Sequence, residues 1–227
     1  KTTSSTSKPN PMAPMLRSRE RRSTSWLGEK ALVFRIREGA PEMYAAFEEV
    51  CGRYALELRP FPAEALEIHP QGDLNRWNAR QIVEHLVLTY KSSGSVLQQR
   101  LDKGRPTQAR ATIKQRIPQF VLLALGIMPS GRLSPASVTP AAAPGRSLDG
   151  AALADLLRSE LQRLDELLVQ CEKRFGKQQM ATHQILGPLS AEQWRRFHVV
   201  HARHHLKQVK SIRNSELMKE VQVPVQD

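Results

Sequence analysis

The feature that most constrains the fold is a run of leucines with helical spacing that follows Asp149. An α-helix brings residues three and four positions apart to one side, so this run predicts a long helix with one apolar face. Asp149 can cap its first turn, and the apolar face must be buried against other elements. The residues of that face are Leu153, Leu156, Leu157, Leu161, Leu164, Leu167, Leu168 and Cys171.

Three further segments have helical periodicity. Apolar residues spaced by three and four predict a helix over residues 41–58. Asn78 with Gln81, and Ser190 with Gln193, have the spacing of capping boxes. They predict the starts of two more long helices, which run to about residues 101 and 217. Strand-like runs of β-branched and aromatic residues are nearly absent, which favours an all-α fold.

The segment between the second and third long helices has a different composition. Residues 108–126 predict a shorter helix that is first basic and then apolar. Residues 127–148 contain four prolines, which exclude a long helix there. We therefore expect an all-α four-helix bundle over residues 26–218, with an inserted helix and a proline-rich linker between helices 2 and 3.

Both ends of the chain lack apolar periodicity. Residues 1–25 are rich in Ser, Thr, Pro and Arg, so we expect a disordered N-terminal tail, and residues 219–227 predict a flexible C-terminal one. A basic, Ser-rich beginning is also typical of an organelle transit peptide. We prefer the interpretation that it is an upstream extension, with Met12 or Met15 nearer the true start. No apolar stretch approaches the ~20 residues of a membrane span, so we expect a soluble, cytoplasmic protein with no membrane partner.

The charge distribution argues against a nucleic-acid-binding protein, and the cysteine content argues against a cysteine-based metal or redox site. The formal net charge is +12 at pH 7. The basic excess lies partly in the N-terminal tail and partly on expected exposed helix faces, without interleaved aromatic residues, so we do not expect nucleic-acid binding. Cys51 and Cys171 each lie in a helical pattern and carry no metal or redox spacing. We expect both to be reduced and structural.

Five of the seven histidines lie between His183 and His205. On a helical wheel, His201 and His205 lie one turn apart at the centre of the apolar face of the last helix. Protonated imidazoles would repel each other there, whereas a shared cation would stabilise both. Hydrogen-bonded core histidines are the alternative interpretation, and the spacing leaves both open. We expect His198 and His204 to be rim or surface residues rather than metal ligands.

A third ligand would come from the second helix. His85 shares a face there with Thr89 and Ser93, which are small and polar, as a hydrated pocket requires. The set of His85, His201 and His205 favours a divalent transition metal, zinc or nickel first and iron or manganese as alternatives, over magnesium or calcium. Three protein ligands leave one coordination position open, which is typical of catalytic sites. Without a carboxylate at comparable spacing, a two-metal site is not expected.

Two segments resemble a known family. They are WNARQIVEHLV (residues 77–87) and GPLSAEQWRRFHVVHARHHLKQV (residues 187–209), and they are similar to the DinB superfamily over roughly residues 40–215. The resemblance implies an up-down-down-up four-helix bundle with a three-histidine metal site at one end, formed by His85, His201 and His205. It also implies activity: characterised members include transferases that join a low-molecular-weight thiol to an electrophile, others are regarded as hydrolases, and many have no known activity.

Together these features predict a metal-dependent enzyme. The first expectation is a transferase whose partners are a small thiol and an electrophilic substrate. A metal-dependent hydrolase and a non-catalytic metal-binding bundle are the alternatives, and neither composition nor spacing separates them. Arg80 or Arg203 at the pocket mouth would bind carboxylates of the thiol. A homodimer is also left open.

Overall fold

The leucine-rich segment forms α6 (Gly150–Phe175), the longest helix in the part of the chain that the structure describes. In the computed structural model, the described residues are 41–129, 134–142 and 147–215, with the backbone alone for residues 41–44, and all belong to one unit, Ala40–Asp227. The expected tails, residues 1–25 and 219–227, lie outside the described residues.

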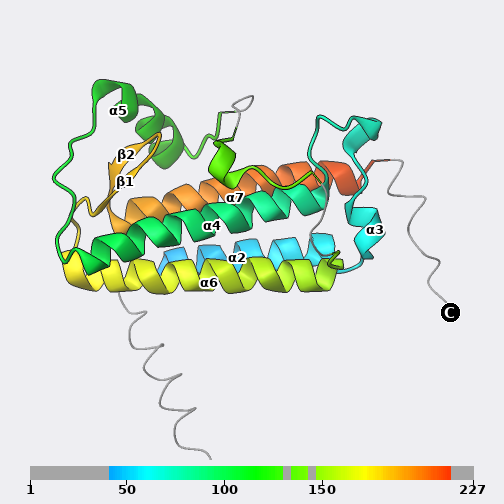
Figure 1. Ribbon diagram of the computed structural model, residues 1–227, viewed down its shortest axis with the longest axis horizontal. Helices are drawn as coiled ribbons and strands as arrows, with labels where there is room; N and C mark the ends of the chain where they lie inside the picture. Colours follow the sequence, from blue (N-terminus) through cyan, green and yellow to red (C-terminus); the bar gives the residue numbers. More distant parts are fainter. Residues whose placement is uncertain (1–40, 130–133, 143–146, 216–227) are drawn as a thin grey trace, which may run out of the picture. The chain divides into compact units, whose positions relative to one another are not determined.

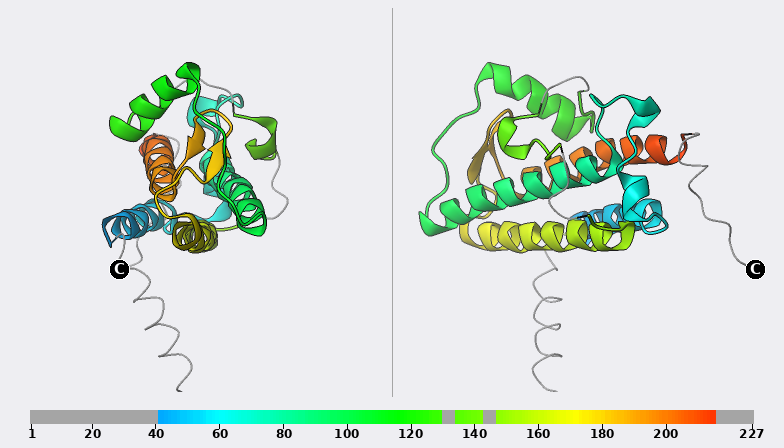
Figure 2. Two further views of the ribbon diagram at one scale, coloured as in Figure 1. Left: turned by 90° about the vertical axis from the view of Figure 1, so that its left-hand side faces the viewer. Right: turned by 45° about the vertical axis from the view of Figure 1, so that its right-hand side comes forward.

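Four long helices pack around a common core: α2 (Pro41–Leu58), α4 (Ala79–Asp102), α6 and α7 (Ala191–Arg213). Both α2 and α4 pack against α6 and against α7 (Figure 1). The end-on view in the left panel of Figure 2 shows these four helices around one centre. The fold is mostly helical, as expected, because the apolar face of each helix can be buried only against its neighbours.

The expected caps are present where the long helices begin. The Asn78 side chain accepts from Gln81 N at 2.9 Å, and the Gln81 side chain accepts in return from Asn78 N at 3.1 Å. Ser190 and Gln193 form the same reciprocal pair before α7. Asp149 accepts from the N–H of the third residue of α6. These caps satisfy backbone N–H groups that lack a partner inside the helix.

The inserted segment differs from its expected form. A single helix over residues 108–126 is wrong: α5 (Ile113–Gln119) begins after the capping residue Thr112, and η3 (Phe120–Ala124) continues it as a π-helix. Pro118 accounts for the switch to a π-helix, because proline has no N–H and its ring crowds the carbonyl one turn earlier. The segment expected as a linker contains a short 3₁₀ turn, η4 (Ala136–Val138). Figure 2 shows α5 outside the four long helices.

Two short strands precede α7. Strand β1 (Ala181–His183) pairs antiparallel with β2 (Gly187–Leu189), with His183 opposite Gly187. Gly187 and Pro188 thus open strand β2. Gly187 has a φ of 74°, a left-handed conformation that favours glycine. The remaining short elements, α3 (Ala63–Leu66) and η2 (Pro70–Gly72), connect α2 to α4.

Two smaller findings complete the fold. Cys51 and Cys171 are both buried and free, as expected. Among the described residues, no helix is long and apolar enough to span a bilayer.

Candidate metal centre

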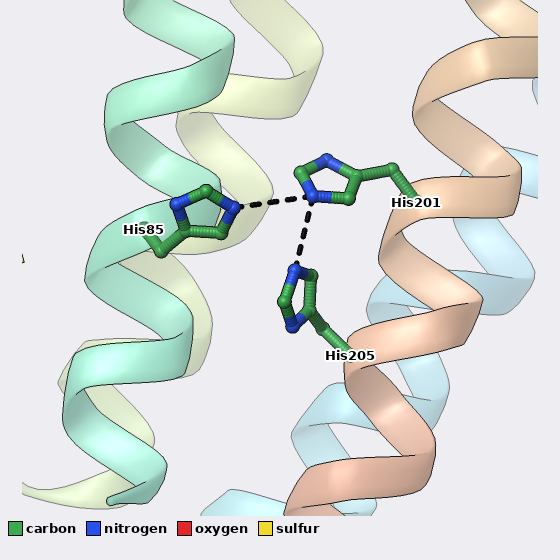
Figure 3. A group of neighbouring side chains, drawn as sticks. All are labelled: His85, His201 and His205. Carbon is green, nitrogen blue, oxygen red and sulfur yellow. Dashed lines mark hydrogen bonds between the residues drawn. The ribbon is translucent and has the colours of Figure 1, made fainter. Parts of the chain in front are cut away.

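Three histidines that are far apart in the sequence converge between α4 and α7. His85 comes from α4, and His201 and His205 come from adjacent turns of α7 (Figure 3). The Nε2 atom of His201 lies 3.2 Å from Nε2 of His85 and 3.0 Å from Nε2 of His205. All three side chains are buried. The three residues selected from helical spacing are therefore brought together, and they could hold a metal ion.

The hydrogen bonds at the far side of two rings fix which nitrogen faces the centre. Nδ1 of His85 lies 2.8 Å from the carbonyl oxygen of Val138, which can only accept, so Nδ1 carries the hydrogen. Nδ1 of His205 donates in the same way to Oε1 of Gln208 at 2.7 Å. In the neutral rings, both Nε2 atoms then present lone pairs to the centre. Such outer partners orient metal-binding histidines in proteins.

The spacing of the three nitrogens suits a metal better than hydrogen bonds among the rings. Nε2 of His201 can donate one hydrogen, so it cannot satisfy the lone pairs of both His85 and His205. One cation can accept all three lone pairs. Imidazole nitrogens bound at about 2.0–2.1 Å on tetrahedral corners lie about 3.3–3.4 Å from one another, close to the distances above.

Burial keeps these rings in the neutral form that a metal requires. Desolvation, followed by the charges of His205 and His85, lowers the pKa of His201 well below its ordinary value. Desolvation and His85 lower the pKa of His205 to about 3. Desolvation also lowers the pKa of His85, although the hydrogen bond that the ring donates to the Val138 carbonyl raises it. Protons therefore compete weakly with a metal ion near neutral pH.

Aromatic rings hold the histidines in place. Trp77 lies against His85, with ring centroids 4.9 Å apart, and stacks on His205 at 6.4 Å. Phe197 stacks on His201 at 5.5 Å. These contacts exclude water from the sides of the cluster and restrict the rotamers of all three rings.

The cluster faces a cavity of about 990 Å³. Side chains from α4 and α7, the inserted segment, the β1–β2 hairpin and the loop before α4 all line it. Its charged lining residues are two cations, Arg76 and Lys207, and no Asp or Glu of the described part of the chain lines it. This volume is at the upper end of the range for small-molecule sites, about 300–1,000 Å³.

The arginines expected at the pocket mouth have other roles. Arg80 is buried and pairs with Glu67 at 2.6 Å and with Glu84. Arg203 pairs with Glu49 at 2.6 Å. Neither lines the cavity. Their carboxylate partners lie at the end of α3 (Glu67), on α4 (Glu84) and on α2 (Glu49), and these ion pairs take up their charge.

The other histidines do not join the cluster. His204 is half-buried and lines the cavity. His198 was expected at the rim, and this is wrong: it is fully buried against Tyr90 and Trp194, and burial lowers its pKa to about 3. Neither ring nitrogen of His198 has a hydrogen-bond partner among the described residues. The group that could hold a metal ion contains neither of these two histidines.

Sequence reasoning missed the groups that orient the ligands. Gln208 lies three positions after His205, a spacing that places both on one side of a helix, so this partner could have been predicted. Val138 contributes a backbone carbonyl from the expected linker, and no sequence pattern marks a carbonyl. Trp77 was noted only as part of the family resemblance, although it contacts two of the three rings.

Fold and site together define a mostly helical protein with a buried three-histidine cluster beside a large cavity. Residues 63–212 match the model of a family described as "Protein of unknown function (DUF1569)", and the chain belongs to this family. The resemblance to the DinB superfamily is therefore wrong. Two histidines one turn apart with a third on a neighbouring helix form a local pattern that any helical bundle can present, so they do not identify a family. No curated protein and no solved structure matches the chain.

Proposed function

We propose that His85, His201 and His205 bind one divalent transition metal, zinc or nickel in the first place, and that the protein uses it to transfer a small thiol to an electrophile. The observation that carries this proposal is the convergence of three buried Nε2 atoms at the edge of a cavity of about 990 Å³. Neutral imidazoles leave the ion its full charge for an incoming anion.

A catalytic role is favoured over a structural one by the number of ligands. Structural zinc sites are closed by four protein ligands, whereas catalytic sites keep one position for water or substrate. Here the described residues supply three ligands, and the rings line a cavity large enough for a substrate.

Thiol transfer is favoured over hydrolysis by the lining of the cavity. Hydrolysis at a metal commonly uses a carboxylate as general base, and no Asp or Glu of the described residues lines this cavity. A thiol loses its proton without a general base more readily than water does, because its pKa of about 8.5 is far below that of water. The volume also accommodates two reactants, which a transferase must hold together.

The proposed reaction is a nucleophilic substitution. A divalent ion at the three histidines supplies Lewis acidity, which favours the thiolate form of a bound thiol at neutral pH. The sulfur forms a bond to the electrophilic carbon, the bond from that carbon to its leaving group breaks, and the thiol proton passes to water. Val138 and Gln208 keep the ligand lone pairs directed at the centre throughout.

Lys207 and Arg76 give the cavity a preference for anionic reactants. Both line it, and Lys207 forms no ion pair with a described residue. We propose that they bind a carboxylate of the thiol or the electrophile. Lys210, three positions further along α7, offers a matched comparison, because it pairs with Glu57 at 3.4 Å and does not line the cavity.

The test is a panel of thiols and electrophiles assayed with zinc- or nickel-loaded protein, with and without chelator. We expect a thioether product. Its formation should stop when chelator is added and in the His201→Ala variant, and it should continue in the His204→Ala variant. Lys207→Gln should raise KM for a carboxylate-bearing thiol about fivefold, and Lys210→Gln should not. If the protein hydrolyses a substrate in a chelator-sensitive way and forms no thiol conjugate, it is a hydrolase and the transferase proposal is wrong. Metal binding without either activity would favour a non-catalytic bundle.

We also propose that the four long helices have the up-down-down-up order. The colour ramp of Figure 1 supports this, because it runs in one direction along α2 and α7 and in the other along α4 and α6. Partners beyond small molecules, a homodimer and a cytoplasmic location stay predictions.

A further inference from the structure

The inserted segment carries a large apolar surface that the rest of the protein does not cover. Ile113, Ile117 and Phe120 follow one another at spacings of four and three, which places them on one side of α5 and the first turn of η3. Their exposed fractions are 79%, 64% and 61%. Leu125 and Ile127, just beyond η3, are also more than half exposed. We call these five residues the α5 patch.

Large exposed apolar groups that lie together mark an interaction site, whereas scattered ones do not. The opposite side of the same segment is already occupied, because Leu122 is buried and Pro118 lines the cavity. Gln119 also donates to the carbonyl of Pro188 in β2, at 3.3 Å. The segment is therefore fixed to the protein on one side and presents the α5 patch on the other.

The charged side chains of the inserted segment are all of one sign. Asp102 and Asp149 are consecutive acidic residues in the sequence, so no carboxylate side chain lies anywhere between them. Five exposed cations precede or border the patch, and none forms an ion pair with a described residue. They are Lys103, Arg105, Arg110, Lys114 and Arg116.

We propose that the α5 patch binds an anionic lipid bilayer, with its apolar side chains in the interface and its cations at the headgroups. Basic amphipathic segments bind bilayers in this way without crossing them. A second copy of the chain fits poorly, because two such segments would place cations against cations. Nucleic acid fits poorly too, because four of the five side chains of the α5 patch are aliphatic and offer no stacking surface for bases. The proposal does not rest on the proposed enzymatic function.

The test uses the full chain in a flotation assay with vesicles of phosphatidylcholine alone or mixed equally with phosphatidylglycerol. We expect binding to the mixed vesicles only, and loss of binding at high salt. Ile117→Ser with Phe120→Ser should reduce the partition coefficient at least tenfold. Lys114→Gln with Arg116→Gln should reduce it about fivefold for each lost cation.

The matched control is Leu56→Ser with Leu74→Ser, which removes two apolar side chains of similar exposure, 73% and 79%, outside the α5 patch. It should bind vesicles like the parent. Circular dichroism would verify that every variant keeps its helix content. Binding that the patch variants retain, or an absence of binding to anionic vesicles, would overturn the proposal. A dimer in light scattering that the Ile117→Ser, Phe120→Ser variant no longer forms would also overturn the proposal, because the α5 patch would then bind a second copy of the chain.

Discussion

Nε2 of His85 and Nε2 of His201 lie 3.2 Å apart, although 116 positions separate the two residues in the chain. Nothing local brings them together. The contact depends on α4 packing against α7, and on the Val138 carbonyl that holds the His85 ring from behind. The three-histidine cluster is therefore a product of helix packing, and its disruption should be visible in both metal affinity and stability.

Zinc should stabilise the protein through the three-histidine cluster. At a free concentration one hundred times Kd, a ligand that binds only the folded state adds about 2.7 kcal/mol to the free energy of unfolding. For a chain of this size, that corresponds to a rise in Tm of roughly 5–10 °C, measured by differential scanning fluorimetry. His201→Ala should lose the rise and His204→Ala should keep it. An equal rise in His201→Ala would place the metal elsewhere.

Gln208→Ala should weaken metal binding without removing a ligand. Its side chain accepts from Nδ1 of His205 at 2.7 Å and so keeps Nε2 free for the metal. Loss of such a partner commonly costs 10–100-fold in affinity. Competition with a chromophoric chelator measures the change, and Gln208→Glu should restore or improve binding, because a carboxylate is a stronger acceptor. If Gln208→Ala binds as tightly as the parent, the hydrogen bond does not orient the ring.

The metal-free protein should lose stability as pH falls below about 6.5. Burial lowers the pKa of His198 and His205 to about 3 and that of His183 to about 4, so the unfolded chain binds these protons first. The stability that each buried histidine contributes is complete above its pKa in the unfolded chain. It is lost as the pH falls from there toward its pKa in the folded protein. Each such group gives a slope of up to about 1.4 kcal/mol per pH unit.

Replacing His198 isolates one part of this dependence. His198→Phe should flatten the decrease in unfolding free energy between pH 6.5 and 4, measured by urea denaturation at several pH values. It should also stabilise the protein near neutral pH, because both ring nitrogens of His198 are buried without a partner among the described residues. An unchanged slope would show that His198 is solvated in the folded state.

Two glycines should respond in opposite ways to alanine. A Cβ added at Gly150 would lie 1.7 Å from the carbonyl oxygen of Leu58, so Gly150→Ala must displace α6 from the end of α2. We expect a loss of at least about 2 kcal/mol. Gly52 lies inside α2 with nothing within 4 Å of an added Cβ, so Gly52→Ala should gain up to about 1 kcal/mol. Urea denaturation of both variants compares them, and equal effects would contradict the packing of the α2–α6 junction.

Much of the local structure was determined by the sequence alone. The caps at Asn78, Asp149 and Ser190 and the leucine face of α6 follow from rules that act within a few residues. His201 and His205 could be placed side by side for the same reason, since residues four apart lie on one side of a helix. The family could not be inferred in this way, because the same local spacing occurs in unrelated helical proteins.

Tertiary structure alone decided the rest. The burial of His198 depends on Tyr90 from α4, and the orientation of His85 depends on a carbonyl from η4. The β1–β2 hairpin consists of two strands of only three residues each. Each is a contact between segments that are distant in the chain or too short to carry a periodic signal. A sequence encodes helix faces through regular spacing, but which faces meet, and which side chains then lose water, is determined only when the helices pack.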